Sequence, residues 1–266
     1  MRIFIIAMDD PVRTAGFIRA VIDARGSDII GLSVPEGNRL SLAKNRSKFR
    51  YILSLFLIMG PWHFLRNSLI VMDHTIRKRL HRWGCLPDPT IAGYAVKKGI
   101  QVFGMRSPNH DDFLAMLKGL EPDIIINQSQ CILKKEILQI PSMGILNRHN
   151  ALLPRNRGRL APFWSVYQEE KETGVSIHFV EEGVDAGKII VREKFSIAAN
   201  DTFNTLVKRC YSMAPALMLR AIDLLEQGHK DFMENDDGLA TYHSTPTVQE
   251  AFHYRMKRLK SFLRYA

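Results

Sequence analysis

The sequence has few cysteines, glycines and prolines for its 266 residues. Its three cysteines, Cys85, Cys131 and Cys210, stand far apart and form no CxxC pair. This spacing excludes a disulfide framework and a cysteine-based zinc site. The 17 glycines and 12 prolines are too few for a collagen-like or low-complexity chain. With 46% hydrophobic and 24% charged residues, the composition is that of a folded protein with a substantial core.

The apolar runs of the sequence are short. The first, over residues 3–8, ends on Asp9 and Asp10 and is shorter than the apolar region of a signal peptide. We therefore expect it to be the first strand of a cytoplasmic protein. The longest stretch without formal charge, residues 51–65, has Gly60 and Pro61 in its middle. A helix needs about 20 apolar residues to cross a bilayer, so this stretch is not expected to span one.

Positive charge is concentrated in two segments. The formal net charge is +10, yet residues 36–85 carry ten lysines and arginines against two acidic residues. Residues 251–266 carry five basic residues and no acidic one. The remainder of the chain is therefore mildly acidic. An excess of basic residues is typical of nucleic-acid binding proteins, but here it belongs to one internal segment and the tail.

Strand-like and helical segments alternate along the chain. Apolar runs bounded by turn residues predict strands at 2–8, 28–34, 101–104, 123–127, 144–147, 175–180 and 188–195. Helical spacing is found at 14–24, 91–98 and 111–120. This order predicts an α/β fold with a doubly wound, mostly parallel, Rossmann-like sheet. Such sheets place ligands at the carboxyl ends of their strands.

Two segments stand outside this alternation. Residues 41–83 are too long for a simple connection, and their apolar and basic composition predicts an insertion of two short helices. These helices either pack on the domain or on a partner subunit, which we favour, or lie in a membrane interface. A long helix is predicted over 201–228, with Asp201 as its N-cap and a kink or break at Pro215. A basic helix is predicted over 247–264.

The densest cluster of polar side chains follows the strand predicted at 144–147. Asn147 and His149 end that run, and Asp185 lies in a glycine-containing turn between two later apolar runs. An asparagine and a protonated histidine can donate hydrogen bonds to a developing oxyanion, while an aspartate can hold the imidazole charged or accept a proton. Each residue alone is as well explained by a turn or a core, but the trio suits attack on a carbonyl carbon.

The order of these motifs resembles the folate-dependent formyltransferase family. The motifs are NxH at 147–149, LLP at 152–154, RG at 157–158, and HFV at 178–180 followed by VDxG at 184–187. The resemblance implies that Asn147 and His149 bind the formyl oxygen as it becomes an oxyanion. It also implies that Asp185 holds His149 charged and relays protons from the attacking amine. Where the family often has an aromatic residue, this chain has Asn156.

The resemblance also implies a domain organisation. Residues 1–200, with the insertion, would form the catalytic domain of an enzyme, and residues 201–266 a helical C-terminal extension. The alternative is a non-catalytic binding module that retains the fold, in which case Asn147, His149 and Asp185 would be relics.

The formyl donor implied by the resemblance is 10-formyltetrahydrofolate, bound mainly through backbone groups of two loops. The folate-binding residues implied are Gln130, Cys131, Ile132, Leu133, Val180, Glu181 and Gly183. His178, in the strand before the second loop, either lines the folate site or is structural. No metal site is predicted, because the acidic residues at 111–112 fit the first turn of a helix better than a metal centre.

The resemblance leaves the acceptor amine open. We favour the amino group of a nucleotide-linked amino sugar for surface polysaccharide, largely by elimination. Methionyl-tRNA formyltransferases add a C-terminal β-barrel, whereas residues after 200 indicate helix, and formyltetrahydrofolate hydrolases add an N-terminal regulatory domain. The glycine-rich phosphate loop of the purine enzyme is missing after the first strand.

Methionyl-tRNA is the alternative acceptor. The basic residues at 77–79 and in the tail are suited to neutralise phosphates, but few aromatic residues accompany them for base stacking. Beyond a small-molecule amine, two partners stay open: a second copy in a homodimer, and the inner face of the membrane, contacted peripherally by the insertion.

Overall fold

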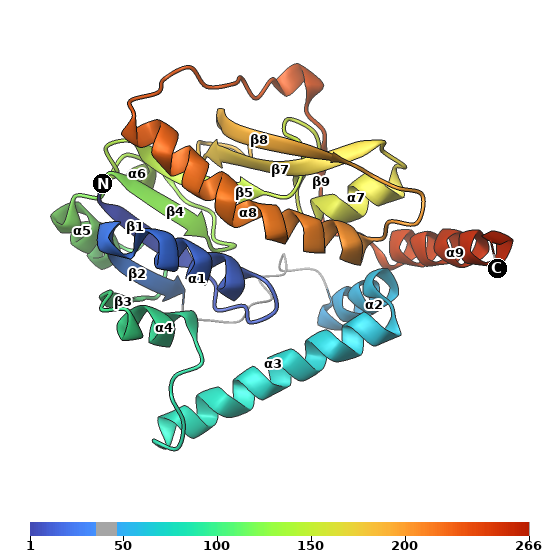
Figure 1. The fold of residues 1–266 in the computed structure, drawn as a ribbon, viewed down its shortest axis with the longest axis horizontal. Coiled ribbons are helices and arrows are strands. Elements are labelled where there is room, and N and C mark those ends of the chain that lie inside the picture. The colour runs from blue at the N-terminus through green and yellow to red at the C-terminus, as the bar shows by residue number, and fades with distance from the viewer. Residues whose placement is uncertain (36–46, 266) are drawn as a thin grey trace.

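The computed structural model describes residues 1–35 and 47–265, with side chains described as far as residue 259. The first residues of the predicted insertion, 41–46, lie outside the described residues. A seven-stranded sheet in the order β3-β2-β1-β4-β5-β7-β8 forms the centre of the molecule (Figure 1). Its strands are β1 (Ile3–Ala7), β2 (Ile29–Pro35), β3 (Val102–Met105), β4 (Ile124–Gln128), β5 (Gly144–His149), β7 (Glu172–Phe179) and β8 (Ile189–Ser196).

The predicted doubly wound, mostly parallel sheet is confirmed. The first five strands of the sheet are parallel, while β7 pairs antiparallel with both β5 and β8. All five residues of β1 are fully buried, because helices cover both faces of the sheet and neighbouring strands flank β1 on both sides. A separate two-stranded pair joins β6 (Arg157–Gly158) to β9 (Tyr242–His243).

Helices cover the two faces of the sheet and enclose two cores (Figure 1). One face carries α1 (Thr14–Arg25), α4 (Ile91–Lys97) and α8 (Phe203–Glu226), and the other carries α5 (Asp111–Leu120) and α6 (Lys135–Leu138). Short 3-10 turns occur at Gly26–Asp28 and Asp237–Leu239. Because the strands point their carboxyl ends to one edge, the loops after β4 and β5 meet there.

Helix α8 differs from its prediction in two ways. Its N-cap is Thr202, not Asp201, because the Thr202 side chain accepts a hydrogen bond from the backbone N–H of Thr205, and the Thr205 side chain accepts one from the backbone N–H of Thr202. Asp201 instead accepts hydrogen bonds from Thr205 and Arg209. The helix also continues through Pro215 without a break.

The insertion consists of α2 (Lys48–Met59) and α3 (Pro61–Arg82), joined at Gly60, whose φ of +80° lies in the left-handed region open to glycine. Helix α2 packs against the last helix, α9 (Val248–Tyr265), and contributes Ile58 to a third core with α7 (Ala161–Tyr167) and α8. The expected packing on the domain therefore holds for α2.

Helix α3 corrects the prediction of two short helices. It has 22 residues and runs along the edge of the molecule, away from the sheet (Figure 1). This helix is described throughout, and His74 is its only buried residue. Along the described chain, no helix combines the length and apolar character needed to cross a membrane.

Candidate functional site

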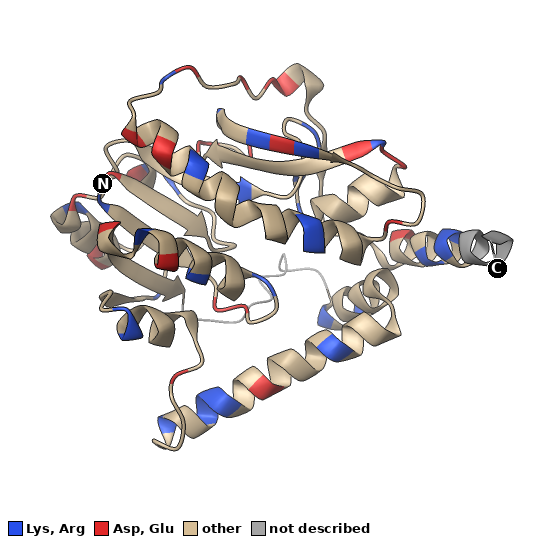
Figure 2. Cartoon of the chain, in the orientation of Figure 1, with Lys and Arg blue, Asp and Glu red and all other residues tan. Residues whose placement is uncertain are grey.

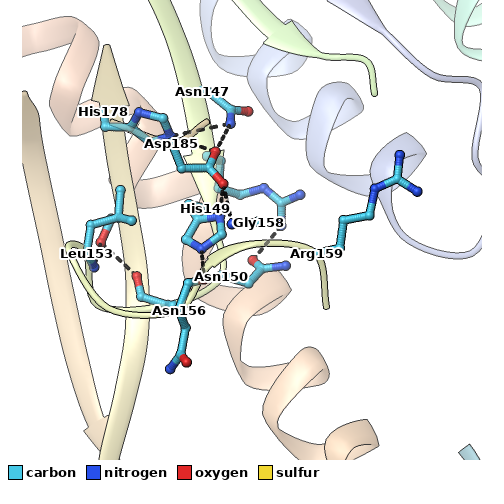
Figure 3. A network of polar contacts seen from close by, with 12 residues as sticks. Asn147, His149, Asn150, Leu153, Asn156, Gly158, Arg159, His178 and Asp185 are labelled. Carbon is cyan, nitrogen blue, oxygen red and sulfur yellow. Dashed lines mark hydrogen bonds and ion pairs between the residues drawn. The ribbon is translucent and has the colours of Figure 1, made fainter. Parts of the chain in front are cut away.

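The site lies at the carboxyl ends of β4 and β5, where an open α/β sheet places its ligands. Asn147 and His149 belong to β5, and Asp185 stands in the loop between β7 and β8. The antiparallel pairing of β7 with β5 sets His178 directly opposite Asn147. Figure 3 shows these side chains converging, so the structure brings the three predicted catalytic residues together.

Asp185 contacts both of the other predicted residues. Its Oδ2 atom lies 3.4 Å from Nδ1 of His149, and its Oδ1 atom accepts a hydrogen bond of 3.4 Å from Nδ2 of Asn147. The two oxygens of one carboxylate thus bridge an imidazole and an amide. An arrangement of one proton acceptor beside two potential donors can both move a proton and stabilise developing negative charge.

Three further contacts hold the Asp185 loop in place. The residue has a φ of +52°, a left-handed conformation that aspartate tolerates better than most side chains. The backbone N–H of Gly158 donates to Asp185 Oδ2 at 2.9 Å. From the segment after α8, Asn235 donates through Nδ2 to the carbonyls of Asp185 and Gly187, both at 2.8 Å. The carboxylate is therefore preorganised.

The environment keeps Asp185 ionised. Burial by itself would raise the pKa of this carboxyl, but the facing His149, the contact with His178 and the Gly158 N–H outweigh burial. The net result is a pKa well below the usual range of an aspartate. At neutral pH the site therefore contains a carboxylate that can accept a proton.

His149 is held at both ring nitrogens. Nε2 lies 2.7 Å from the carbonyl oxygen of Asn156 and donates to it, while Nδ1 faces Asp185. Burial lowers the pKa of His149, and the raising effects of Asp185 and the Asn156 carbonyl do not fully compensate. The pKa of His149 therefore lies below the usual value of a histidine, which favours a neutral imidazole. The implied role of Asp185, to hold His149 charged and relay protons, stays a prediction.

The amide of Asn147 is oriented by a chain of buried polar groups that the sequence did not predict. Gln128, the last residue of β4, donates through Nε2 to Oδ1 of Asn147 at 2.8 Å and accepts from Nε of Arg148 at 3.0 Å. The Arg148 guanidinium also donates to the hydroxyl of Tyr211 and lies over its ring. With Oδ1 occupied, the Nδ2 donor of Asn147 must point toward Asp185 and His178.

His178 belongs to the same cluster. Its Nδ1 donates to the carbonyl of the neighbouring residue, Phe179, at 2.6 Å, and its Nε2 lies 3.4 Å from Nδ2 of Asn147. The same Nε2 lies 3.6 Å from Oδ1 of Asp185. His178 therefore lies within the catalytic cluster through contacts with protein groups, and the interpretation that it lines the folate site stays a prediction.

The two predicted folate loops follow β4 and β7, the strands on either side of β5 in the sheet. Leu133 and Val180 belong to one apolar cluster, Cys131 is half-buried, and Gln130, Ile132, Glu181 and Gly183 are exposed. The first loop is fastened by Asn109, whose amide donates to the Ile132 carbonyl at 2.8 Å and accepts from the Lys134 N–H at 2.9 Å. The assignment of these seven residues to folate stays a prediction.

Several residues that build the site carried little sequence signal. Gln128 could have been suspected because it ends a strand next to β5, and Gly158 belongs to the RG motif. Asn235 lies in a segment without strand or helix periodicity, so nothing in the sequence ties it to Asp185. The described residues hold no group of three histidine, cysteine or acidic side chains able to bind a metal ion.

Comparison with known proteins assigns this chain to a family. The model of the formyl transferase family matches residues 87–222, and the chain belongs to this family. The predicted family is thus confirmed. The matched residues include β4, β5 and the Asp185 loop.

The curated relatives of similar sequence are named methionyl-tRNA formyltransferases. The methionyl-tRNA formyltransferase of Kosmotoga olearia is 33% identical over 158 residues, which are 59% of this chain and 50% of that protein. The chain spans about half the length of the curated relatives that it matches.

Solved structures share the fold at low sequence identity. An N-formyltransferase from Helicobacter canadensis, in complex with folinic acid and dTDP-3-aminofucose, has a TM-score of 0.62 at 15% identity. The alignment covers 98% of this chain and 82% of that one. A phosphoribosylglycinamide formyltransferase from Bacillus halodurans has a TM-score of 0.59 at 18% identity, with 86% and 97% covered.

Proposed function

We propose that this protein transfers a formyl group from 10-formyltetrahydrofolate to the amino group of a nucleotide-linked amino sugar. The observation that carries the formyl transfer is the cluster of Asn147, His149 and Asp185, in contact with one another at the carboxyl edge of the sheet in a chain of the formyl transferase family. A carboxylate, an imidazole and an oriented amide are the groups that attack of an amine on a formyl carbon requires.

In this proposal each residue has a separate task. The amide of Asn147, already oriented by Gln128, donates a hydrogen bond to the formyl oxygen as negative charge develops on it. Asp185 accepts the proton that the attacking amine loses. His149 is neutral at rest and can receive that proton on Nδ1, which converts it into a cation beside the same carboxylate.

The proton and bond changes balance within the two substrates. A new bond forms between the acceptor nitrogen and the formyl carbon, and the bond between that carbon and the folate nitrogen breaks. The proton released by the amine ends on the folate nitrogen, so His149 and Asp185 return to their starting states. 10-Formyltetrahydrofolate supplies the activated formyl group; the residues orient the reactants and move the proton.

The share of this chain that aligns with a sugar-nucleotide-binding enzyme supports the sugar acceptor. The structural alignment with the Helicobacter canadensis N-formyltransferase covers 98% of this chain. The Kosmotoga olearia protein aligns with little more than half of it. A chain that aligns over almost its whole length with an enzyme solved with an amino-sugar nucleotide is a good candidate for similar acceptor chemistry.

Methionyl-tRNA is the second candidate, because the curated relatives have this activity in their names. It competes directly with the sugar, since either acceptor would present its amine to the same carboxylate. The basic face of α3 would provide a surface for phosphates.

A mass-spectrometric assay tests the proposal. The purified full chain is incubated with 10-formyltetrahydrofolate and, separately, with a panel of nucleotide-linked amino sugars, with methionyl-tRNA, and with no acceptor. We expect one formyl group on an amino sugar. Formylated tRNA would show that methionyl-tRNA, and not the sugar, is the acceptor. Release of formate without an acceptor would indicate a hydrolase. No product in any arm would contradict the proposed activity.

A further inference from the structure

The outward side of α3 presents an apolar stripe that nothing in the described chain covers. Trp62, Leu65, Leu69, Met72 and Ile76 recur every three or four residues along the helix, so they share one side. Their exposed fractions are 71, 53, 49, 53 and 49%. Soluble proteins rarely leave a continuous apolar surface uncovered unless something binds to it.

The opposite side of α3 attaches the helix to the body of the protein. His74 is buried there, with Nε2 2.8 Å from Oδ2 of Asp9, and Nζ of Lys78 lies 3.6 Å from the same oxygen. With 3.6 residues per helical turn, the stripe points away from this attachment. The helix is therefore fixed with its apolar side directed outward.

Basic residues border the stripe on both flanks. Arg66 and Arg77 lie on one flank, and Arg79 and Arg82 on the other, as the helical repeat places them. The only acidic residue of α3, Asp73, is already paired with Arg77 at 2.8 Å. Figure 2 shows the basic residues along α3 at the edge of the molecule.

Exposed tryptophans stand close to both ends of this surface. Trp62 is the second residue of α3, and Trp83 directly follows the helix with 74% of its surface exposed. Tryptophan favours the boundary between lipid headgroups and acyl chains, because its ring is apolar and its N–H needs a polar partner. Arginine side chains that border an apolar stripe can extend to phosphate groups at the same depth.

We propose that α3 is a docking surface for an anionic lipid bilayer. The helix lies parallel to the membrane, with its apolar stripe at the headgroup boundary and its flanking arginines on lipid phosphates. The site at the carboxyl edge of the sheet would then work close to the membrane. This inference concerns binding alone and does not depend on the identity of the acceptor.

Charge disfavours the other occupants of this surface. Two copies that joined their stripes would bring the flanking arginines of both into proximity, with no unpaired acidic side chain on α3 to offset them. A nucleic acid would engage the arginines but leave Leu65, Leu69 and Met72 in water. An anionic bilayer complements the arginines and the stripe together.

Vesicle sedimentation with the full chain tests the proposal. Vesicles of pure phosphatidylcholine are compared with vesicles that contain phosphatidylglycerol, at low and high salt. We expect binding to the anionic vesicles that weakens at high salt. Equal binding to both vesicles would overturn the assigned role of the arginines, and no binding to either would overturn the proposal.

Paired substitutions locate the binding surface. The double variant Leu69→Gln, Met72→Gln should lose about tenfold or more in vesicle affinity through lost apolar burial, and Arg66→Gln, Arg79→Gln a similar factor through lost charge. The matched controls alter exposed residues elsewhere: Val96→Gln with Leu239→Gln, and Lys208→Gln with Arg220→Gln. Controls that lose as much affinity as the α3 variants would contradict the assigned location.

Tryptophan fluorescence provides a readout that sedimentation lacks. Trp164 is already buried at 6% exposure, so a change on vesicle addition reports on Trp62 and Trp83. We expect a blue shift with anionic vesicles and no shift with poly-U RNA. Light scattering without lipid tests whether a second copy of the chain covers the stripe instead. The proposal would be overturned if the parent protein formed a dimer that the Leu69→Gln, Met72→Gln variant did not form, and if vesicles left the tryptophan spectrum unshifted.

Discussion

Asp185 must stay charged although it is largely buried. A carboxylate removed from water needs nearby donors. Here two donors to the carboxylate come from different parts of the chain, the Asn147 amide from β5 and the Gly158 N–H from β6. Asn235, from the segment after α8, donates instead to the backbone carbonyl of Asp185 and so supports the loop. The residue is thus stabilised in the state in which it can accept a proton.

Replacement of Asp185 by asparagine tests its proposed task at the residue scale. Asparagine has almost the same shape and tolerates the left-handed backbone at this position, so the fold should persist. Because the amide cannot take up a proton, kcat should fall by about 10²–10⁴-fold. Initial rates with the acceptor identified by the formylation assay give the measurement.

The control for this variant is Asp231→Asn, which makes the same chemical change at an exposed position outside the site. Its rate should match that of the parent protein. A normal rate for Asp185→Asn, with both variants folded by circular dichroism, would remove Asp185 from the proposed mechanism.

The charge of His149 can be followed directly by NMR titration of its ring. Burial lowers its pKa, and the facing carboxylate of Asp185 partly opposes this shift. In the Asp185→Asn variant the opposing charge is gone, so the pKa of His149 should fall further and the ring should stay neutral to lower pH. A higher pKa in the variant would show that the carboxylate does not act on this ring.

At the scale of single elements, the start of α8 shows how local chemistry sets a boundary. Thr202 and Thr205 exchange hydrogen bonds across the first turn, which satisfies backbone donors that otherwise have no partner in the helix. Asp201 is a residue type that often caps helices and directly precedes Thr202, so the sequence alone favours it as the N-cap. In the structure it accepts hydrogen bonds from the side chains of Thr205 and Arg209 instead.

Loss of this cap should destabilise the protein measurably. We expect Thr202→Ala to lower the free energy of unfolding by about 0.5–2 kcal/mol, since the side-chain acceptor for the helix start disappears. Urea denaturation measures the difference. The control, Ser212→Ala, alters an exposed hydroxyl within the same helix and should change the free energy of unfolding by no more than about 0.5 kcal/mol. If both variants changed the free energy of unfolding equally, the loss would be due to helix propensity and not to capping.

At the scale of the whole molecule, the two helices of the insertion differ in how they meet the domain. Helix α2 packs into a core, and helix α3 runs along the edge of the molecule. Helix α2 enters a core with α7, α8 and α9, and Arg255 of α9 donates through Nε to the carbonyl of Leu57 at 2.8 Å. Helix α3 then continues from Gly60 toward the outside. The packing of α2 and the contact of His74 with Asp9 together hold the exposed surface of α3 in a defined orientation.

Two isoleucines of α2 test this attachment. Ile58 is buried at 1% exposure, whereas Ile52 is 44% exposed on the same helix. Ile58→Ala should cost about 2–5 kcal/mol in the free energy of unfolding, because it leaves a cavity between α2 and its neighbours. Ile52→Ala should cost about 0.5 kcal/mol or less. Similar losses for both, measured by denaturant unfolding, would contradict the packing of α2 on the domain.

Much of the fold could be predicted because its elements are locally consistent. The strand at residues 3–7 is a continuous apolar run, and the strand at 124–128 begins with three isoleucines. The helix at 111–120 begins with two acidic residues and has an apolar face. The elements missed, α6, α7, β6 and β9, are short ones, of two to seven residues. Such segments contain too few residues for a periodicity to emerge.

By itself, the sequence determined the α/β class, the family, and three side chains at strand ends and in one turn, because these depend on residue order and local periodicity. Only the tertiary structure decided which partners those side chains have. Gln128, Gly158 and Asn235 reach the site from three different segments. The burial that lowers the pKa of His149 is likewise a property of the folded chain. The exposure of the α3 stripe was likewise settled by packing, since an apolar helical face has the same pattern whether it is buried or not.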